Sequence, residues 1–328
     1  MPAPRDRPTV DADPTGFVVS SVVTAFAPTA DLLDNLRVLV EQVDQVVVVD
    51  DGSGPGYDDV LAAATSLGAR VVRLPENLGI AAALNAGVAA LLEPDAAREP
   101  DGIVFFDQDS RIGPGFVRSL TAAHVAAARA GIPVAATAPE FFAGVSQAHG
   151  ERDGHLLSRQ PIQSGLLVSA VAVGVVGPFR DDLFIDLVDT EYTMRAEAHG
   201  FVTIAARGLD LPHALGRRVA LSPFGRVVRV PGGQPIGFTV SAPFRYYYRA
   251  RNRVVVNRAY RRRRPFAVAR ATVLEWRHYV IVWFAVRERR RFAAILRAGR
   301  ADGRRGRLGR IPDAVARAAA DITWRAPL

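Results

Sequence analysis

The sequence predicts an α/β protein whose mostly parallel sheet is covered by helices on both faces. Apolar, β-branched runs predict buried strands, and the segments between them have helical spacing. Strands that alternate with helices of this length indicate parallel βαβ units. The predicted strands are 17–24, 46–49, 70–74 and 103–106, and the predicted helices are 31–40, 57–67 and 79–92.

Composition indicates a core-forming globular protein. The chain has 328 residues, of which 49% are hydrophobic and 23% are charged, and this excludes wholesale disorder. It is long enough for one large domain or for a domain with an appendage. With no cysteine, the chain has no disulfide framework, thiolate metal site or cysteine nucleophile.

Charge is distributed unevenly along the chain. Residues 245–310 contain 21 arginines and only three acidic residues, although the whole chain has a net charge of only +8. Aromatic residues lie among these arginines, a pattern that fits an anionic membrane surface, a solvated helix surface or nucleic acid. We expect 244–328 to be an arginine-rich helical extension, in which 273–284 lies shallowly in a membrane interface. The apolar run 279–286 is too short to span a bilayer.

The two ends of the chain carry weaker signals. Residues 1–16 are rich in proline and aspartate and lack the apolar core of a secretory signal, so they are predicted to be a disordered lead-in. Residues 312–320 begin with proline and predict a short helix.

Polar residues follow each predicted strand. Asp107 and Asp109 end the fourth strand, and side chains two residues apart on an extended chain point the same way, so both can converge on one hard cation. A turn capped by aspartate is the alternative interpretation. Because ligands bind beyond the carboxyl ends of such strands, the sequence predicts a binding site at this edge. The first three strands are followed there by Thr24, by Asp50 and Asp51, and by Asn77.

Several motifs in a fixed order resemble a known family. TxFxP at Thr24, VVVVDDGS, NLGIAAALNAG and FFDQDS resemble the nucleotide-sugar-binding half of inverting family 2 glycosyltransferases of the GT-A fold. Further along, QSG at Gln163, GPFRDDLFIDLVDTEYTMRAEAHGF, LPHALG and RYYYRARN resemble the bacterial rhamnosyltransferase branch. The resemblance covers about 17–260 and implies a GT-A catalytic domain at 17–243.

The resemblance also implies roles for donor and metal residues. Asp50 or Asp51 would contact the nucleobase and ribose, and Asp107 would lie near the ribose or sugar. Asp109 and His213 would hold a divalent metal, Mg²⁺ or Mn²⁺, on the donor diphosphate. Since Mg²⁺ strongly prefers oxygen ligands, a histidine ligand favours Mn²⁺ or a similar ion.

The remaining roles concern the base and the acceptor. Asp189 matches the catalytic base of the family, and Arg195 matches the arginine that follows that base. Near the N-terminus of a helix Asp189 could instead be a helix cap. Arg251 and Asn252 match a pair that lines the donor phosphate or the acceptor pocket, and we expect Glu191 to contact acceptor.

The chemistry of sugar transfer agrees with these residue types. Departure of a diphosphate requires neutralisation of its charge, and the acceptor hydroxyl requires a carboxylate that takes its proton. Inversion needs one base, whereas retention usually needs a nucleophile as well.

The resemblance to the rhamnosyltransferase branch implies transfer of L-rhamnose from dTDP-L-rhamnose to a lipid-linked cell-surface glycan. We expect a cytoplasmic enzyme, peripheral on the inner face of the plasma membrane. Two alternatives remain open at this point: the donor is UDP-galactofuranose or UDP-GlcNAc, or the chain is a non-catalytic protein that binds a nucleotide or a membrane.

Overall fold

The computed structural model describes residues 16–93, 98–213, 216–222 and 226–327. They form two compact units: unit 1 contains the described residues up to Asp181 together with 189–213, and unit 2 contains 182–188 together with the described residues from 216 onward. The units thus divide after His213, earlier than the boundary predicted at residue 244, and a short segment before Asp189 belongs to unit 2. The predicted lead-in lies, except for Gly16, outside the described residues.

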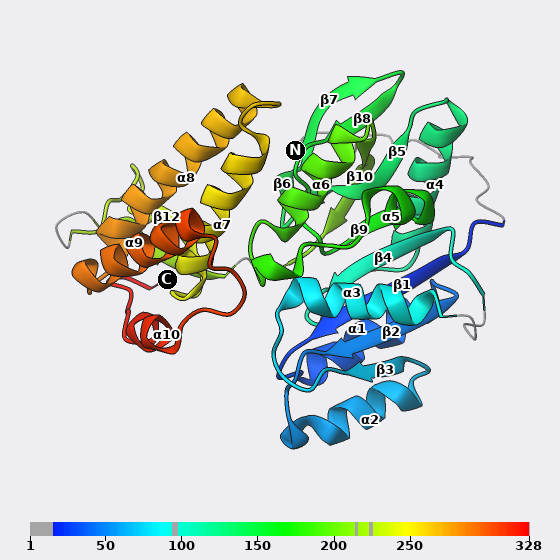
Figure 1. Cartoon of the computed structure of the whole chain (residues 1–328), viewed down its shortest axis with the longest axis horizontal. Helices are drawn as coiled ribbons and strands as arrows, with labels where there is room; N and C mark the ends of the chain where they lie inside the picture. Colours follow the sequence, from blue (N-terminus) through cyan, green and yellow to red (C-terminus); the bar gives the residue numbers. More distant parts are fainter. Residues whose placement is uncertain (1–15, 94–97, 214–215, 223–225, 328) are drawn as a thin grey trace. The chain divides into compact units, whose positions relative to one another are not determined.

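The first half of unit 1 is the parallel arrangement that the sequence predicts (Figure 1). β1 lies between β2 and β4, β3 pairs with β2, and all three pairings are parallel. Every residue of β1 is buried, as expected for a strand covered on both faces. The elements are β1 (Val19–Ala25), α1 (Ala30–Leu39), β2 (Gln45–Asp50), α2 (Asp58–Ser66), β3 (Arg70–Arg73), α3 (Ile80–Leu91) and β4 (Gly102–Asp107).

The second half of unit 1 makes the sheet mixed. β9 pairs antiparallel with both β4 and β5, and β10 then runs parallel to β5. Within the described residues the sheet has ten strands, in the order β3-β2-β1-β4-β9-β5-β10-β8-β7 with β6 on β5. The α/β class is therefore confirmed. The elements are α4 (Phe116–Arg129), β5 (Val134–Phe142), β6 (Val145–Ser146), β7 (Ala148–Arg152), β8 (His155–Ser158), β9 (Leu166–Ser169), α5 (Ala170–Val176), α6 (Val188–Ala198) and β10 (Val202–Leu211).

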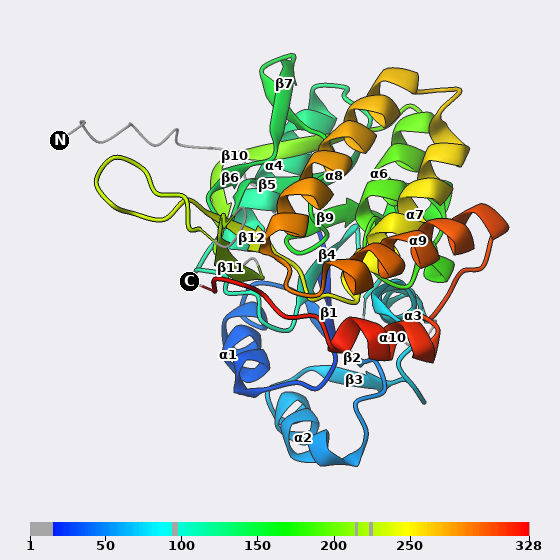
Figure 2. The ribbon, with the colours of Figure 1, turned by 90° about the vertical axis from the view of Figure 1, so that its left-hand side faces the viewer.

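Unit 2 contains the predicted C-terminal helices (Figure 2). Two glycines allow helix α9 to approach α7 closely. A Cβ at Gly299 would lie 2.3 Å from the Tyr247 carbonyl oxygen, and one at Gly303 would lie 2.5 Å from the Arg251 carbonyl oxygen. The aromatic residues Tyr246, Tyr247 and Tyr248 are buried in the hydrophobic core of unit 2. The elements are β11 (Arg217–Ala220), β12 (Gly237–Val240), α7 (Arg245–Tyr260), α8 (Pro265–Ala285), α9 (Arg289–Arg305) and α10 (Asp313–Ala320).

Among the described residues no helix combines the length and the apolar character that a membrane span requires.

Candidate functional site

Three of the predicted site residues share one edge of the sheet in unit 1. Thr24 pairs in register with Asp107, and Ala25 pairs with Asp50, so the carboxyl ends of β1, β2 and β4 coincide. Because the three strands are parallel, their terminal polar groups meet at the place where α/β sheets bind ligands.

Hydrogen bonds to neighbouring segments fix the turn after β4. The side-chain amide of Gln108 donates to the Phe26 carbonyl oxygen (3.1 Å) and accepts from the Phe26 N–H (2.9 Å). On the other side, Ser110 Oγ lies 2.6 Å from Ser164 Oγ, which also accepts from the Asp107 N–H at 3.3 Å. The turn therefore holds Asp107 and Asp109 in a defined place, and Ser164 gives the QSG motif a structural role.

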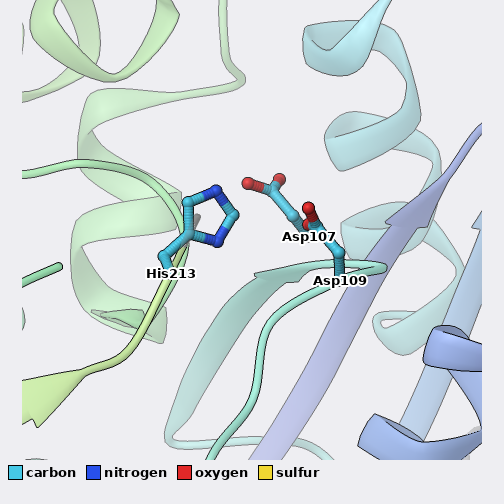
Figure 3. Close-up of side chains that lie close together, drawn as sticks. All are labelled: Asp107, Asp109 and His213. Carbon is cyan, nitrogen blue, oxygen red and sulfur yellow. The ribbon is translucent and has the colours of Figure 1, made fainter. Parts of the chain in front are cut away.

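Asp107, Asp109 and His213 form a cluster that could hold a metal ion. One ligand atom from each lies within 4.8 Å of the others, and the imidazole faces the two carboxylates (Figure 3). Strand β10 pairs with β5 up to Leu211, which lies opposite Phe142. His213 follows two residues later, and its ring lies 5.0 Å from that of Phe142. The spacing of Asp107 and Asp109 predicted that both could converge on one cation, whereas the family resemblance placed Asp107 near the ribose or sugar.

An unsatisfied nitrogen of His213 indicates that this cluster suits a cation. The Nδ1 atom of His213 is buried and has no hydrogen-bond partner among the described residues. Leaving a buried polar atom unsatisfied costs about 1–3 kcal/mol, which a bound ion would remove. Two carboxylate oxygens and one imidazole nitrogen suit Mn²⁺ or a similar divalent ion.

Asp50 and Asp51 fix the loops around the edge. Asp51 accepts from the backbone N–H groups of Leu78 (2.7 Å) and Gly79 (3.0 Å), and burial raises the pKa of its carboxyl while these bonds oppose the rise. Asp50 accepts from the Ser53 N–H and hydroxyl and is itself buried. Both carboxylates thus have structural partners, and their predicted donor contacts stay predictions.

The loop after β3 approaches the loop after β2 closely. Gly52 has a φ of +72°, and a Cβ there would lie 2.3 Å from the carbonyl carbon of Glu76. In the same loop, the side-chain oxygen of Asn77 is buried and has no hydrogen-bond partner in the described part of the chain. Asn77 is predicted to contact the nucleotide sugar, and its side-chain oxygen could accept a hydrogen bond from that ligand.

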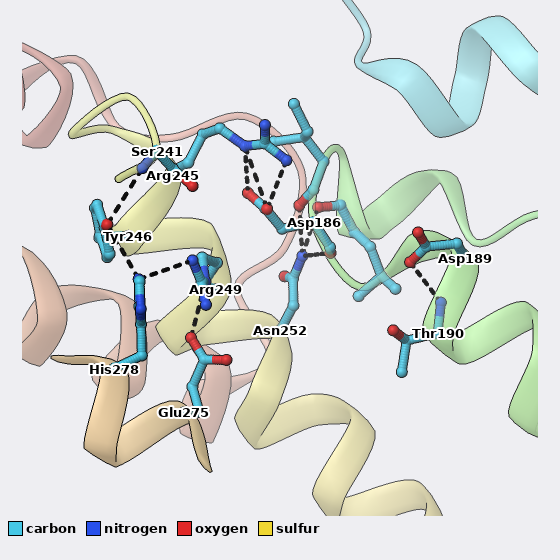
Figure 4. A network of polar contacts seen from close by, with 12 residues as sticks. Asp186, Asp189, Thr190, Ser241, Arg245, Tyr246, Arg249, Asn252, Glu275 and His278 are labelled. Atoms are coloured by element: carbon cyan, nitrogen blue, oxygen red, sulfur yellow. Dashed lines mark hydrogen bonds and ion pairs between the residues drawn. The ribbon is translucent and has the colours of Figure 1, made fainter. Parts of the chain in front are cut away.

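Asp189 lies in the first turn of α6. It is half-buried, and one carboxylate oxygen accepts from the Thr190 N–H at 2.6 Å (Figure 4). Acidic residues are favoured in the first turn of a helix, whether they serve as a base or as a cap. The geometry is compatible with either the predicted base or a local cap.

Glu191 and Arg195 form a structural pair one turn along α6. The Glu191 carboxylate is buried and accepts from Arg195, with a closest distance of 3.0 Å. Arg195 also donates to the carbonyl oxygens of Val176 (2.6 Å) and Pro178 (2.8 Å). The pair therefore fastens the segment after α5 to α6, which favours a structural role for Glu191 over the predicted acceptor contact.

Arg251 and Asn252 lie inside unit 2. Arg251 is fully buried and donates to the carbonyl oxygens of Gly309, Asp182 and Leu183 and to the Asn252 side chain. Asn252 in turn donates to the carbonyl oxygens of Leu183, Ile185 and Asp186 at 2.8–2.9 Å. These bonds bind the segment 182–188 to α7, and they favour structural roles over the predicted phosphate or acceptor contacts.

The segment that they hold has an unusual backbone. Phe184, Asp186 and Leu187 all have φ between 63° and 66°, a conformation that costs non-glycine residues energy. Asp186 is further held by Arg245, whose guanidinium nitrogens lie 2.8–3.2 Å from its carboxylate (Figure 4). Sequence reasoning missed Arg245, although the RYYYRARN motif contains it.

Asn252→Ala is expected to lower the free energy of unfolding by about 2–4 kcal/mol, because buried carbonyl oxygens lose their donor. Chemical denaturation of the full chain measures this. Asn257→Ala on the same helix is the matched control: within the described part of the chain its amide donates to Thr272 alone, so about 1 kcal/mol is expected. An equal effect of the two substitutions would mean that Asn252 does not hold the segment.

Comparison with known sequences gives two findings. Residues 20–166 match the profile of the family described as Glycosyl transferase family 2. The chain is also similar to the dTDP-rhamnosyl transferase RfbF of Shigella flexneri, with 29% identity over 256 residues that cover 71% of this chain and 78% of that protein.

Comparison with solved structures finds glucosyl-3-phosphoglycerate synthase of Mycobacterium tuberculosis. Its complex with phosphoglyceric acid has 21% identity and a TM-score of 0.41, covering 59% of this chain and 72% of that one. Its complex with Mg²⁺ and uridine diphosphate has 20% identity and a TM-score of 0.42, covering 60% and 72%.

Proposed function

Because the chain is a glycosyltransferase with a family 2 domain at residues 20–166, we propose that it is an inverting rhamnosyltransferase. In this proposal the donor is dTDP-L-rhamnose and the acceptor is a lipid-linked cell-surface glycan. The similarity to a dTDP-rhamnosyl transferase supports the donor.

The cluster of Asp107, Asp109 and His213 is the observation that carries the proposal. Its two aspartates lie at the end of β4, beside the ends of β1 and β2, so a nucleotide on that edge would place its diphosphate near the cluster. A divalent ion held by Asp109 and His213, with Asp107 beside them, would neutralise the departing diphosphate. Thr24, Asp50, Asp51 and Asn77 border the same edge as candidate donor contacts.

Transfer in this proposal is a single displacement. The oxygen of the acceptor hydroxyl forms a bond to the anomeric carbon of the sugar, and the bond to the diphosphate breaks, so that dTDP leaves with the electron pair. The Asp189 carboxylate takes the proton of the hydroxyl. One base suffices because attack opposite the leaving group inverts the anomeric centre.

Arg251, Asn252 and Glu191 have no ligand role in this proposal. All three side chains are buried and have protein partners. The arginine-rich residues 245–310 support a place on the inner face of the plasma membrane, where anionic lipids attract basic segments.

A thermal-shift panel of nucleotide sugars tests the donor. A ligand at about 100 times its Kd stabilises the folded chain by about 2.7 kcal/mol, so the true donor raises Tm measurably. We expect the largest rise from dTDP-L-rhamnose with Mn²⁺. A larger rise from UDP-galactofuranose or UDP-GlcNAc would overturn the donor, and binding without turnover of any of these donors would favour a non-catalytic protein.

A further inference from the structure

Helix α8 is fastened to α7 by its inner face. Glu275 accepts from the Arg249 Nε at 2.8 Å and lies 3.9 Å from an Arg253 nitrogen. Three residues along, the His278 ring stacks on Tyr246 with centroids 5.8 Å apart, and Val282 is fully buried one turn further. Burial acts to raise the pKa of Glu275, but Arg249 and Arg253 together with Tyr279 hold it below its ordinary value, so this carboxylate stays charged and paired. These contacts fix which face of α8 points outward.

The outward face of α8 carries a line of large apolar residues. Phe266 is 89% exposed, Val273 is 66% exposed and Val280 is 54% exposed. Residues seven positions apart on an α-helix differ by about 20° in direction, so the three form one stripe that turns by about 40° along its length, and the exposed Trp276 lies beside it. The stripe is about 21 Å long at 1.5 Å per residue. A helix facing water would normally carry polar residues along this line.

Arginines border this stripe. Arg270 and Arg277 are exposed and lie on one side of it, and the exposed Arg262 and Arg263 precede the helix. The one acidic residue of α8 is Glu275, which is buried on the opposite face. A two-fold contact with a second copy would bring the arginines of both copies to one interface, where like charges repel. Exposed apolar residues flanked by arginine and tryptophan instead have the composition of a helix that lies in a lipid interface.

We propose that this face, defined by Phe266, Val273, Val280, Trp276, Arg270 and Arg277, binds the surface of an anionic lipid bilayer. The proposal rests on the proposed function, whose acceptor is lipid-linked, and it names the surface that meets the membrane. The apolar side chains insert among the acyl chains, while the arginines contact the phosphate groups of the lipids.

Sedimentation of the full chain with vesicles tests the apolar stripe. The wild-type protein is expected to bind phosphatidylglycerol vesicles and to bind phosphatidylcholine vesicles far less. Val273→Ser with Val280→Ser should weaken binding by about tenfold or more, because two side chains that insert among the acyl chains become polar. The control is Val171→Ser with Val175→Ser on α5, where the valines are 67% and 51% exposed, and this pair should change binding little.

Two further measurements test the arginines of this face and the depth to which Trp276 enters the bilayer. Arg270→Gln with Arg277→Gln should weaken binding to phosphatidylglycerol roughly tenfold, whereas the exposed pair Arg118→Gln with Arg129→Gln should have a smaller effect. In the wild-type protein, lipids brominated on the acyl chain should quench tryptophan fluorescence. Trp276→Phe should remove most of that quenching, and the measurement on the wild-type protein needs no substitution.

The outcomes separate this proposal from the proposed function. Vesicle binding lost in the valine pair, with Mn²⁺-dependent dTDP binding retained, supports the docking face. Equal vesicle binding by that pair and the wild type, or no wild-type binding at all, overturns the docking face and leaves the sugar transfer standing. A dimer in solution that the valine pair dissociates, without vesicle binding, would assign the face to a second copy.

Discussion

Asp189→Asn is expected to lower the rate of rhamnose transfer by roughly two to four orders of magnitude, the usual contribution of a positioned general base. Asparagine has nearly the same shape and can keep the contact with the Thr190 N–H, but it cannot take a proton. Release of dTDP from dTDP-L-rhamnose in the presence of acceptor measures the rate.

The matched control for this substitution is Asp181→Asn, an exposed aspartate of unit 1, which should leave the rate near that of the wild type. Binding of dTDP should be the same in both variants, since neither residue is proposed to hold the nucleotide. Full activity in Asp189→Asn would return this residue to the role of a helix cap.

Asp109→Ala should abolish metal-dependent transfer and leave the protein folded. The side chain is exposed, so its removal changes the free energy of unfolding by no more than about 0.5 kcal/mol. Its loss leaves the cluster with one carboxylate and one imidazole, too few ligands for firm binding of Mn²⁺. Titration of dTDP with and without Mn²⁺ checks the binding step, and Asp34→Ala, an exposed aspartate of α1, serves as the control. Metal-dependent activity that survives in Asp109→Ala would mean that the turn after β4 is only structural.

The sheet edge could be predicted from the sequence because its signals are local. Apolar runs ending in Thr24, Asp50 and Asp107 define strands and their carboxyl ends, and parallel pairing then brings those ends together. The second half of the sheet gave no such signal: β9 is short, and its antiparallel place between β4 and β5 depends on contacts far apart in the chain.

The position of His213 came only from the family resemblance. It is 104 residues beyond Asp109, and β10 delivers it through pairing with β5, which periodicity alone does not reveal. The same limit applies to Arg251 and Asn252. Arginine next to aromatic residues in a sequence is typical of a ligand-binding surface. Arg251 is buried instead because it donates to the carbonyl oxygens of Leu183 and Gly309, which are distant in sequence.

The apolar face of α8 was predicted in part. The sequence indicated a stripe over 273–284, but Tyr279 and Val282 of that range face the core of unit 2. The exposed line begins earlier, at Phe266, because the buried Glu275 and Val282 fix the rotation of the helix. An acidic residue in an apolar helix would ordinarily be assigned to the solvent side, and here its arginine partners reverse that assignment.

Incorporation of radiolabelled rhamnose is the most direct test of the central claim. The wild-type chain is incubated with labelled dTDP-L-rhamnose, Mn²⁺ and membranes from a bacterium whose glycans contain rhamnose. We expect label in the lipid fraction extracted with organic solvent, no label when EDTA removes the metal, and none from Asp189→Asn beyond background. Label that enters the lipid fraction from UDP-galactofuranose but not from dTDP-L-rhamnose, or entry that EDTA does not affect, would contradict a metal-dependent rhamnosyltransferase.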